Sequence, residues 1–204
     1  METYLSLAIG LGLAAACGFR VFVPLLALSI ASNSGHVTLD PFFAWIGTTP
    51  AMIAFSLATA LEIAGYYIPW VDHFLDTVAT PAAVVAGTVV TAAMVSGMSP
   101  FLQWSTAIIA GGGIAGIIQA STVVARAVSS ATTVGVANPV VATAELGLSS
   151  TVSFLSILAP WLAMIVVLAL AGFVAVRIRR KRVTAPPAVP PVLEQARAAQ
   201  ETPQ

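Results

Sequence analysis

Residues 4–31 read YLSLAIGLGLAAACGFRVFVPLLALSIA, and Arg20 is the one charged side chain in this run. An arginine at the centre of a membrane helix costs at least ~2.5–3.5 kcal/mol on insertion scales, and it generally faces a cavity or a partner. Pro24 cannot donate a backbone hydrogen bond to the carbonyl of Arg20, and Gly18 permits a turn. We therefore expect a break in the first helix, or the tip of a hairpin, with Arg20 facing a polar interior.

The composition of the chain indicates that it lies mainly in lipid and not in water. Of its 204 residues 58% are hydrophobic and only 8% are charged, whereas a soluble domain is about 25% charged. Apolar runs of about 18 residues or more indicate helices that cross a membrane. The sequence therefore predicts an all-α, polytopic membrane protein whose main partner is the lipid bilayer.

Five to six apolar segments follow one another along the chain. Their approximate bounds are 4–31, 50–69, 80–98, 104–128, 138–149 and 151–176. The fifth is too short for a bilayer that needs about 20 residues, which predicts a half-helix or re-entrant element. ATALE (58–62) recurs as ATAE (142–145), which fits an inverted repeat of three plus three segments with broken or re-entrant helices, a transporter signature.

The C-terminal region sets the orientation. Five of the eight basic residues lie in RIRRKR (177–182), directly after the last apolar run. The positive-inside rule then places the C-terminus in the cytoplasm, and six crossings would place the N-terminus there too. We expect a transmembrane domain over 1–178 in the inner membrane and a basic, then Pro/Ala-rich, disordered cytoplasmic tail over 179–204. No basic face remains that could bind nucleic acid.

Two acidic residues stand inside apolar segments, Glu62 and Glu145. Desolvation protonates an isolated carboxylate at such a place unless it is paired. Each is therefore a candidate proton carrier, a partner of Arg20 in a structural ion pair, or a neutral hydrogen-bonding acid.

Further polar residues are candidates for contact with a substrate. Arg126, near the end of the fourth segment, either extends to the lipid headgroups or contacts an anionic substrate, and the headgroups are the favoured interpretation. Gln119 and Asn138 supply uncharged hydrogen-bonding groups, and Asn138-Pro139 is typical of a turn that starts a helix.

A third cluster lies between the second and third segments. Asp72, His73 and Asp76 follow Tyr66, Tyr67 and Trp70, which we interpret as an aromatic belt at the membrane surface. Two carboxylates and an imidazole could bind a divalent cation. The alternative is a solvated amphipathic connector whose acids cap helices.

Catalytic motifs are missing from the sequence. GGGIAG (111–116) formally matches G-x-G-x-x-G, but no strand precedes it and no acid follows at the required distance. Close helix packing or a helix break explains these glycines better. We expect neither an enzyme nor a cofactor.

Several stretches resemble a known family. GFRVFVPLLALSIAS, EIAGYYIPWVDHFLDT, IIAGGGIAGIIQ and TTVGVANPVV are similar to bacterial membrane proteins grouped as domain of unknown function 4126. The resemblance covers roughly residues 4–175 and implies a polytopic inner-membrane protein. GFRVFVPLLA also resembles, over ten residues, the re-entrant motif of the DedA superfamily of lipid-phosphate translocases, which implies that Arg20 meets a phosphate.

The leading hypothesis is a small transporter or translocase for an anionic solute or lipid phosphate. Its polar centre would comprise Arg20, Glu62 and Glu145, with a proton as coupling ion. One alternative is a non-transporting scaffold whose buried ion pairs only hold helices together. Another is a divalent-cation transporter using Asp72, His73 and Asp76. The chain could also assemble as a homo-oligomer.

Overall fold

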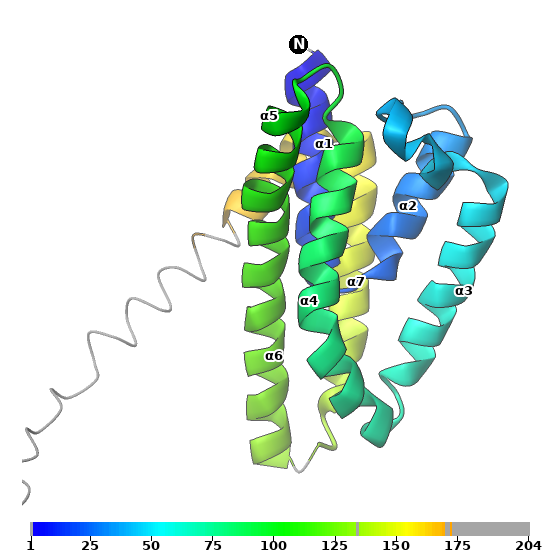
Figure 1. Ribbon diagram of the computed structural model, residues 1–204. Coiled ribbons are helices and arrows are strands. Elements are labelled where there is room, and N and C mark those ends of the chain that lie inside the picture. The colour runs from blue at the N-terminus through cyan, green and yellow to red at the C-terminus, as the bar shows by residue number, and fades with distance from the viewer. Residues whose placement is uncertain (1, 134, 170–171, 173–204) are drawn as a thin grey trace, which may run out of the picture. The chain divides into compact units, whose positions relative to one another are not determined.

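The structure is a computed structural model, and it describes residues 2–133, 135–169 and 172. The side chains of residues 2, 69, 70, 72 and 73 lie outside this description, as does the predicted tail over 179–204. Within the described residues every regular element is a helix (Figure 1), so the all-α prediction is confirmed. The elements are α1 (Glu2–Cys17), α2 (Phe22–Asn33), the 3₁₀ helix η1 (Pro41–Gly47), α3 (Thr49–Gly65), α4 (Pro69–Met94), α5 (Pro100–Thr106), the π-helical turn η2 (Ala107–Gly112), α6 (Gly113–Thr133) and α7 (Asn138–Leu158).

The helices are those of a membrane protein. Three described stretches are long and apolar enough to cross a bilayer, namely Phe74–Met94, Pro100–Thr133 and Asn138–Leu158. A fourth exists if η1 and α3, which meet at 63°, form one span. A shorter apolar helix, Pro160–Ala169, follows α7. The membrane class is thus supported, while the predicted five to six crossings remain a prediction.

The first apolar run forms a helical hairpin, and Arg20 lies at its tip. The backbone of Gly10 in α1 packs on Thr91 near the end of α4, 3.1 Å away from where a Cβ on Gly10 would stand. After α2 the N–H of Asp40 donates to the carbonyl of Ala93 at 2.8 Å. Both arms therefore begin or end beside the same end of α4, and α2 turns back along α1 (Figure 1). The break predicted at Arg20 is present, in its hairpin form.

Neither arm of the hairpin spans a bilayer. The 16 residues of α1 and the 12 residues of α2 measure about 24 and 18 Å at 1.5 Å per residue, against a hydrocarbon core of about 30 Å. Each arm by itself is therefore shorter than the hydrocarbon core.

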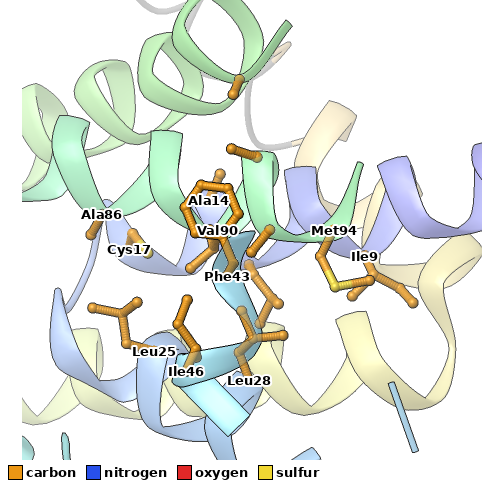
Figure 2. Close-up of a cluster of buried hydrophobic side chains, with 14 of the residues drawn as sticks. Ile9, Ala14, Cys17, Leu25, Leu28, Phe43, Ile46, Ala86, Val90 and Met94 are labelled. Atoms are coloured by element: carbon orange, nitrogen blue, oxygen red, sulfur yellow. The ribbon is translucent and has the colours of Figure 1, made fainter. Parts of the chain in front are cut away.

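A core of small and branched side chains holds the hairpin against α4. Figure 2 shows Leu25 and Leu28 of α2 facing Ala86 and Val90 of α4, all of them buried. Cys17 is buried in the same cluster as a free thiol. Alanines of α1 and α4, among them Ala14, Ala83 and Ala86, lie in the same cluster, and small residues of this kind let helices approach closely in lipid.

Close approach is most evident at the π-helical turn. A Cβ on Gly111 would stand 2.2 Å from the hydroxyl of Thr91 and 2.6 Å from the carbonyl of Gly87 on α4. A Cβ on Gly112 would meet the Thr88 hydroxyl at 2.6 Å. The glycine run was expected to pack helices or to break one. It packs α4 against α6, and the helix continues through it as a π-turn that adds one residue.

Several predicted segment bounds are wrong. α7 runs unbroken from Asn138 to Leu158, so the fifth segment is long enough to span a bilayer instead of being a half-helix. The stretch 69–77, expected as a connector between the second and third segments, is the first part of α4. Serine and threonine within 129–133 continue α6. Polar residues shortened the apparent apolar segments, although the helices continue through them.

Candidate functional site

The Arg20 guanidinium is the largest fully buried side chain in the described part of the chain, with 1% of its surface exposed. One nitrogen, Nη2, donates to the carbonyl of Ala142 on α7 at 2.8 Å and lies 3.8 Å from Oε2 of Glu145. Among the described residues its Nε and Nη1 have no hydrogen-bond partner. Because a buried donor without a partner is costly, Arg20 has capacity for another acceptor.

The Glu62 carboxylate caps the second arm of the hairpin. Its Oε1 accepts the N–H of Val21 at 2.8 Å and its Oε2 accepts the N–H of Phe22 at 3.0 Å. The preceding amides of Phe19 and Arg20 bond to the carbonyl of Ala16 at the end of α1. Every amide across the break is therefore satisfied, and a carboxylate lies at the positive end of α2.

Arg126 and Glu145 form a buried ion pair between α6 and α7. The guanidinium donates through Nε to Oε1 of Glu145 at 3.1 Å and through Nη2 to Oε2. Its Nε also lies 3.6 Å from Oδ1 of Asp76 on α4. The prediction that Arg126 reaches the headgroups is wrong, because 3% of the residue is exposed and a carboxylate is within reach inside the bundle.

The Tyr66 ring lies against both guanidiniums. The central carbon of Arg20 is 3.8 Å from the ring centroid and that of Arg126 is 4.2 Å from it. Such cation–π contacts are strongest where water is excluded. The expected aromatic belt is therefore wrong for Tyr66, which is buried, whereas Tyr67 is exposed and contacts Thr143 through its hydroxyl.

These six residues form one polar centre at the hairpin tip. It comprises Arg20, Glu62, Tyr66, Asp76, Arg126 and Glu145, supplied by the α1–α2 connection, α3, the α3–α4 connection, α4, α6 and α7. With all groups ionised, two guanidiniums and three carboxylates give a charge of minus one. One bound proton or cation would make the centre neutral.

A groove gives the polar centre access to the bundle surface. It has a volume of about 340 Å³ and lies between the hairpin tip, α3 and α4. Glu62 and Tyr66 line it, and the other lining residues are apolar, among them Phe22, Leu61 and Val78. The arrangement can admit a molecule with an apolar part and one charged group.

A second groove of about 400 Å³ runs between α2 and α7. Leu26, Ile30 and Phe154 line its length, and Ser34 and His36 line its end. Its lining contains neither a carboxylate nor a guanidinium, so of these two grooves the one beside Glu62 reaches a charged residue.

The remaining predicted residues divide into near and distant ones. Gln119 is buried on the same face of α6 as Arg126, two helical turns or about 10 Å away. Asn138 starts α7 and donates to the Ser130 hydroxyl at 3.1 Å, which joins the ends of α6 and α7. The role of both residues in binding stays a prediction.

Of the three predicted metal ligands, Asp76 is the one whose side chain the structure describes. Asp76 lies 3.6 Å from Arg126, a competing cation. The side chains of Asp72 and His73 lie outside the described residues. Among the side chains that are described, no three His, Cys, Asp or Glu residues are grouped as a metal site would require.

Two residues of the polar centre were not expected there from the sequence. Tyr66 follows Glu62 by four residues, so the two share a helical face, and that spacing could have placed Tyr66 beside Arg20. The sequence groups Asp76 only with its neighbours Asp72 and His73, as a possible cation ligand. Its contact with Arg126 joins residues distant in the chain, for which no local signal exists.

Fold and site together define an all-helical membrane protein with charged groups gathered at the tip of a buried hairpin. A family described as "Domain of unknown function (DUF4126)" matches residues 7–180, and the chain belongs to it. The local likeness to the DedA superfamily is not shown. No curated protein and no solved structure matches the chain.

Proposed function

We propose that the protein is a small transporter or translocase for an anion, with a solute or a lipid phosphate as cargo and a proton as coupling ion. One observation supports this most strongly. Arg20 is buried at a break between helices, and two of its nitrogens have no partner among the described residues. Broken helices around a central polar site are a recurring design in transporters.

The groove supports the same proposal. It leads from the bundle surface to Glu62 and Tyr66, and Tyr66 in turn touches Arg20. An apolar wall with a charge at its inner end suits an amphiphile such as a lipid phosphate. It also suits a small anion that loses its water on entry.

Topology is part of the proposal. Four spans and a fifth begun at Pro160 would give five crossings, with the α1–α2 hairpin re-entrant. We place the protein in the inner membrane with its C-terminus in the cytoplasm, because the basic run 177–182 follows the last apolar segment. An odd number of crossings then places the N-terminus outside. Glu62 and Glu145 would be the matched acids of an inverted repeat.

Arg20→Ala tests the transport proposal. Purified protein in liposomes would be assayed for uptake of radiolabelled inorganic phosphate and for movement of fluorescent phosphatidylglycerol between leaflets. We expect native protein to accelerate one of these over protein-free liposomes, and Arg20→Ala to lose that flux while still inserting. Asp40→Asn is the control, because Asp40 also accepts a backbone N–H but lies beyond the far end of α2. Equal flux in Arg20→Ala and native protein refutes the proposal.

The scaffold alternative also has an observation in its favour. Glu62 and the Arg126–Glu145 pair have good partners inside the protein. A scaffold predicts that Arg20→Ala and Glu145→Met, which each remove a contact of the buried Arg20–Glu145–Arg126 cluster, both lower the melting temperature in detergent. No flux would be measured for any variant.

A further inference from the structure

The Glu62 carboxylate occupies a position that would suit a free anion. The N–H groups of Val21 and Phe22 both point at it, at 2.8 and 3.0 Å. They open α2, a 12-residue helix, and the N-terminus of a helix attracts negative charge through its free amides and its dipole. Glu62 is held there from another helix, α3, so it is a tethered anion in an anion site.

Arg20 provides the second element of such a site. It directly precedes the two amides, and 1% of it is exposed. Its Nε and Nη1 have no acceptor among the described residues, and the guanidinium interacts electrostatically with Glu62. An oxyanion at the start of α2 could bond to both amides and to Arg20, which a single carboxylate on a short tether does not do.

Space exists for Glu62 to move aside. Its side chain lines the groove of about 340 Å³ whose neighbouring walls are Leu61, Val71 and Leu75. An ionised carboxylate in this apolar groove would be strongly disfavoured, whereas a protonated carboxyl is far less costly. Departure of Glu62 from the amides therefore requires a proton.

We propose that a monovalent oxyanion, such as a phosphodiester or a carboxylate, exchanges with the Glu62 carboxylate at the start of α2, and that Glu62 takes up one proton as it leaves. The proton comes from water and binds a carboxylate oxygen of Glu62. The incoming anion accepts the N–H groups of Val21 and Phe22. Total charge in the polar centre stays the same, so anion and proton enter together. This inference rests on the proposed function and specifies its coupling step.

Other charged and titratable groups face Glu62 from each side. Arg20 and the Cys17 thiol of the hairpin and Glu145 of α7 interact electrostatically with Glu62, and so does Tyr66, which lines the same groove. On α4 the lining residues of the shared groove are apolar, and Asp76 pairs instead with Arg126. Of the three acids, Glu62 is the one that lines the groove.

Calorimetry on the purified protein in an uncharged detergent tests the exchange. The probes are dimethyl phosphate, a free anion, and dihexanoyl phosphatidylglycerol, a lipid headgroup. A phosphodiester lacks the second ionisation near pH 6 that a monoester has, so proton changes belong to the protein. Titrations in buffers of different ionisation enthalpy count protons. We expect one proton taken up per anion, and an affinity that falls up to about tenfold per pH unit as pH rises.

Glu62→Gln provides the matched comparison. It cannot take up the proton, so we expect anion binding with no proton uptake and no dependence on pH, while Asp40→Asn behaves like native protein. Binding of dimethyl phosphate and the lipid alike indicates a free-anion site, whereas binding of the lipid alone indicates a headgroup site. If Glu62→Gln does not fold, the proton count of native protein decides.

Two results would overturn the exchange. One is that neither probe binds native protein, and the other is that binding takes up no proton. Either result leaves the proposed function standing if flux in liposomes still depends on Arg20. Conversely, proton-linked binding to a protein whose Arg20→Ala variant has native flux would overturn the transport role of Arg20 and not the exchange.

Discussion

Arg126 donates to both carboxylate oxygens of Glu145, and this buried pair joins α6 to α7 across the polar centre. Arg20 lies 3.8 Å from the same carboxylate, so Glu145 lies between two guanidiniums. The hairpin tip is thus attached to the α6–α7 pair through the Glu145 carboxylate.

Removing one partner of this pair should destabilise the protein strongly. Arg126→Met leaves Glu145 with its longer contact to Arg20, and Glu145→Met leaves Arg126 beside Asp76. We therefore expect a cost of up to the ~3–5 kcal/mol that is typical of breaking a buried pair. The double variant should cost clearly less than the sum of the two, as measured by denaturant titration in detergent. Additive effects would show that the two side chains are not coupled.

The ring of Tyr66 should matter more than its hydroxyl. Tyr66→Phe retains the face that both guanidiniums contact, so we expect a small change in the free energy of unfolding. Tyr66→Leu loses the cation–π attraction and should cost about 2 kcal/mol, the scale for a desolvated contact. The same denaturant titration measures both, and equal effects would assign the contribution to the hydroxyl, which both variants lack.

Gly18 and Gly113 should respond in opposite ways to alanine. A Cβ on Gly18 would stand 2.6 Å from Cβ of Ile118 and 2.7 Å from the carbonyl of Ala115, so Gly18→Ala should overpack the hairpin against α6 and cost about 1–3 kcal/mol. Gly113 has nothing within 4 Å of its Cβ position. Gly113→Ala should be neutral or stabilise by up to about 1 kcal/mol through helix propensity. Equal melting temperatures for the two variants would contradict the close approach at Gly18.

The proposed topology, a re-entrant hairpin followed by five crossings, predicts which loops share a side of the membrane. Phe43 of η1 packs on Trp104 of α5, with ring centroids 5.9 Å apart, so the loops before each helix lie at one end. In a Cys17→Ala background, Ser34→Cys and Ser99→Cys should react with an impermeant maleimide from one side and Val136→Cys from the other. Reaction of Ser34→Cys from the side of Val136→Cys would contradict the proposed topology, in which three spans separate the two positions.

The sequence predicted much of the hairpin and less of its surroundings. A lone arginine between Gly18 and Pro24 is a local signal, and the break lies where that signal placed it. The contacts of Arg126 and Asp76 depend on helices that meet only in the folded bundle, so segment-by-segment reading assigned both to the membrane surface. In lipid the polar face of a helix turns toward the protein interior, whereas in water it turns outward. Polar residues at a helix end can therefore face inward.

Glu62 shows a second limit of sequence reasoning. Its burial in an apolar segment correctly marked it as needing partners, and side-chain partners were the natural expectation. The partners are the backbone amides of Val21 and Phe22. Main-chain donors become available only where a helix restarts, and no residue type encodes them.

The depth of the hairpin has an electrical consequence. An ion that reaches Arg20 from either side traverses only part of the membrane field, which amounts to about 2.3 kcal/mol per elementary charge for a full crossing at 100 mV. An anion that binds together with a proton carries no net charge along that path. The voltage across the cell envelope would therefore neither drive nor oppose loading, and the concentration gradients of the two species would set its direction.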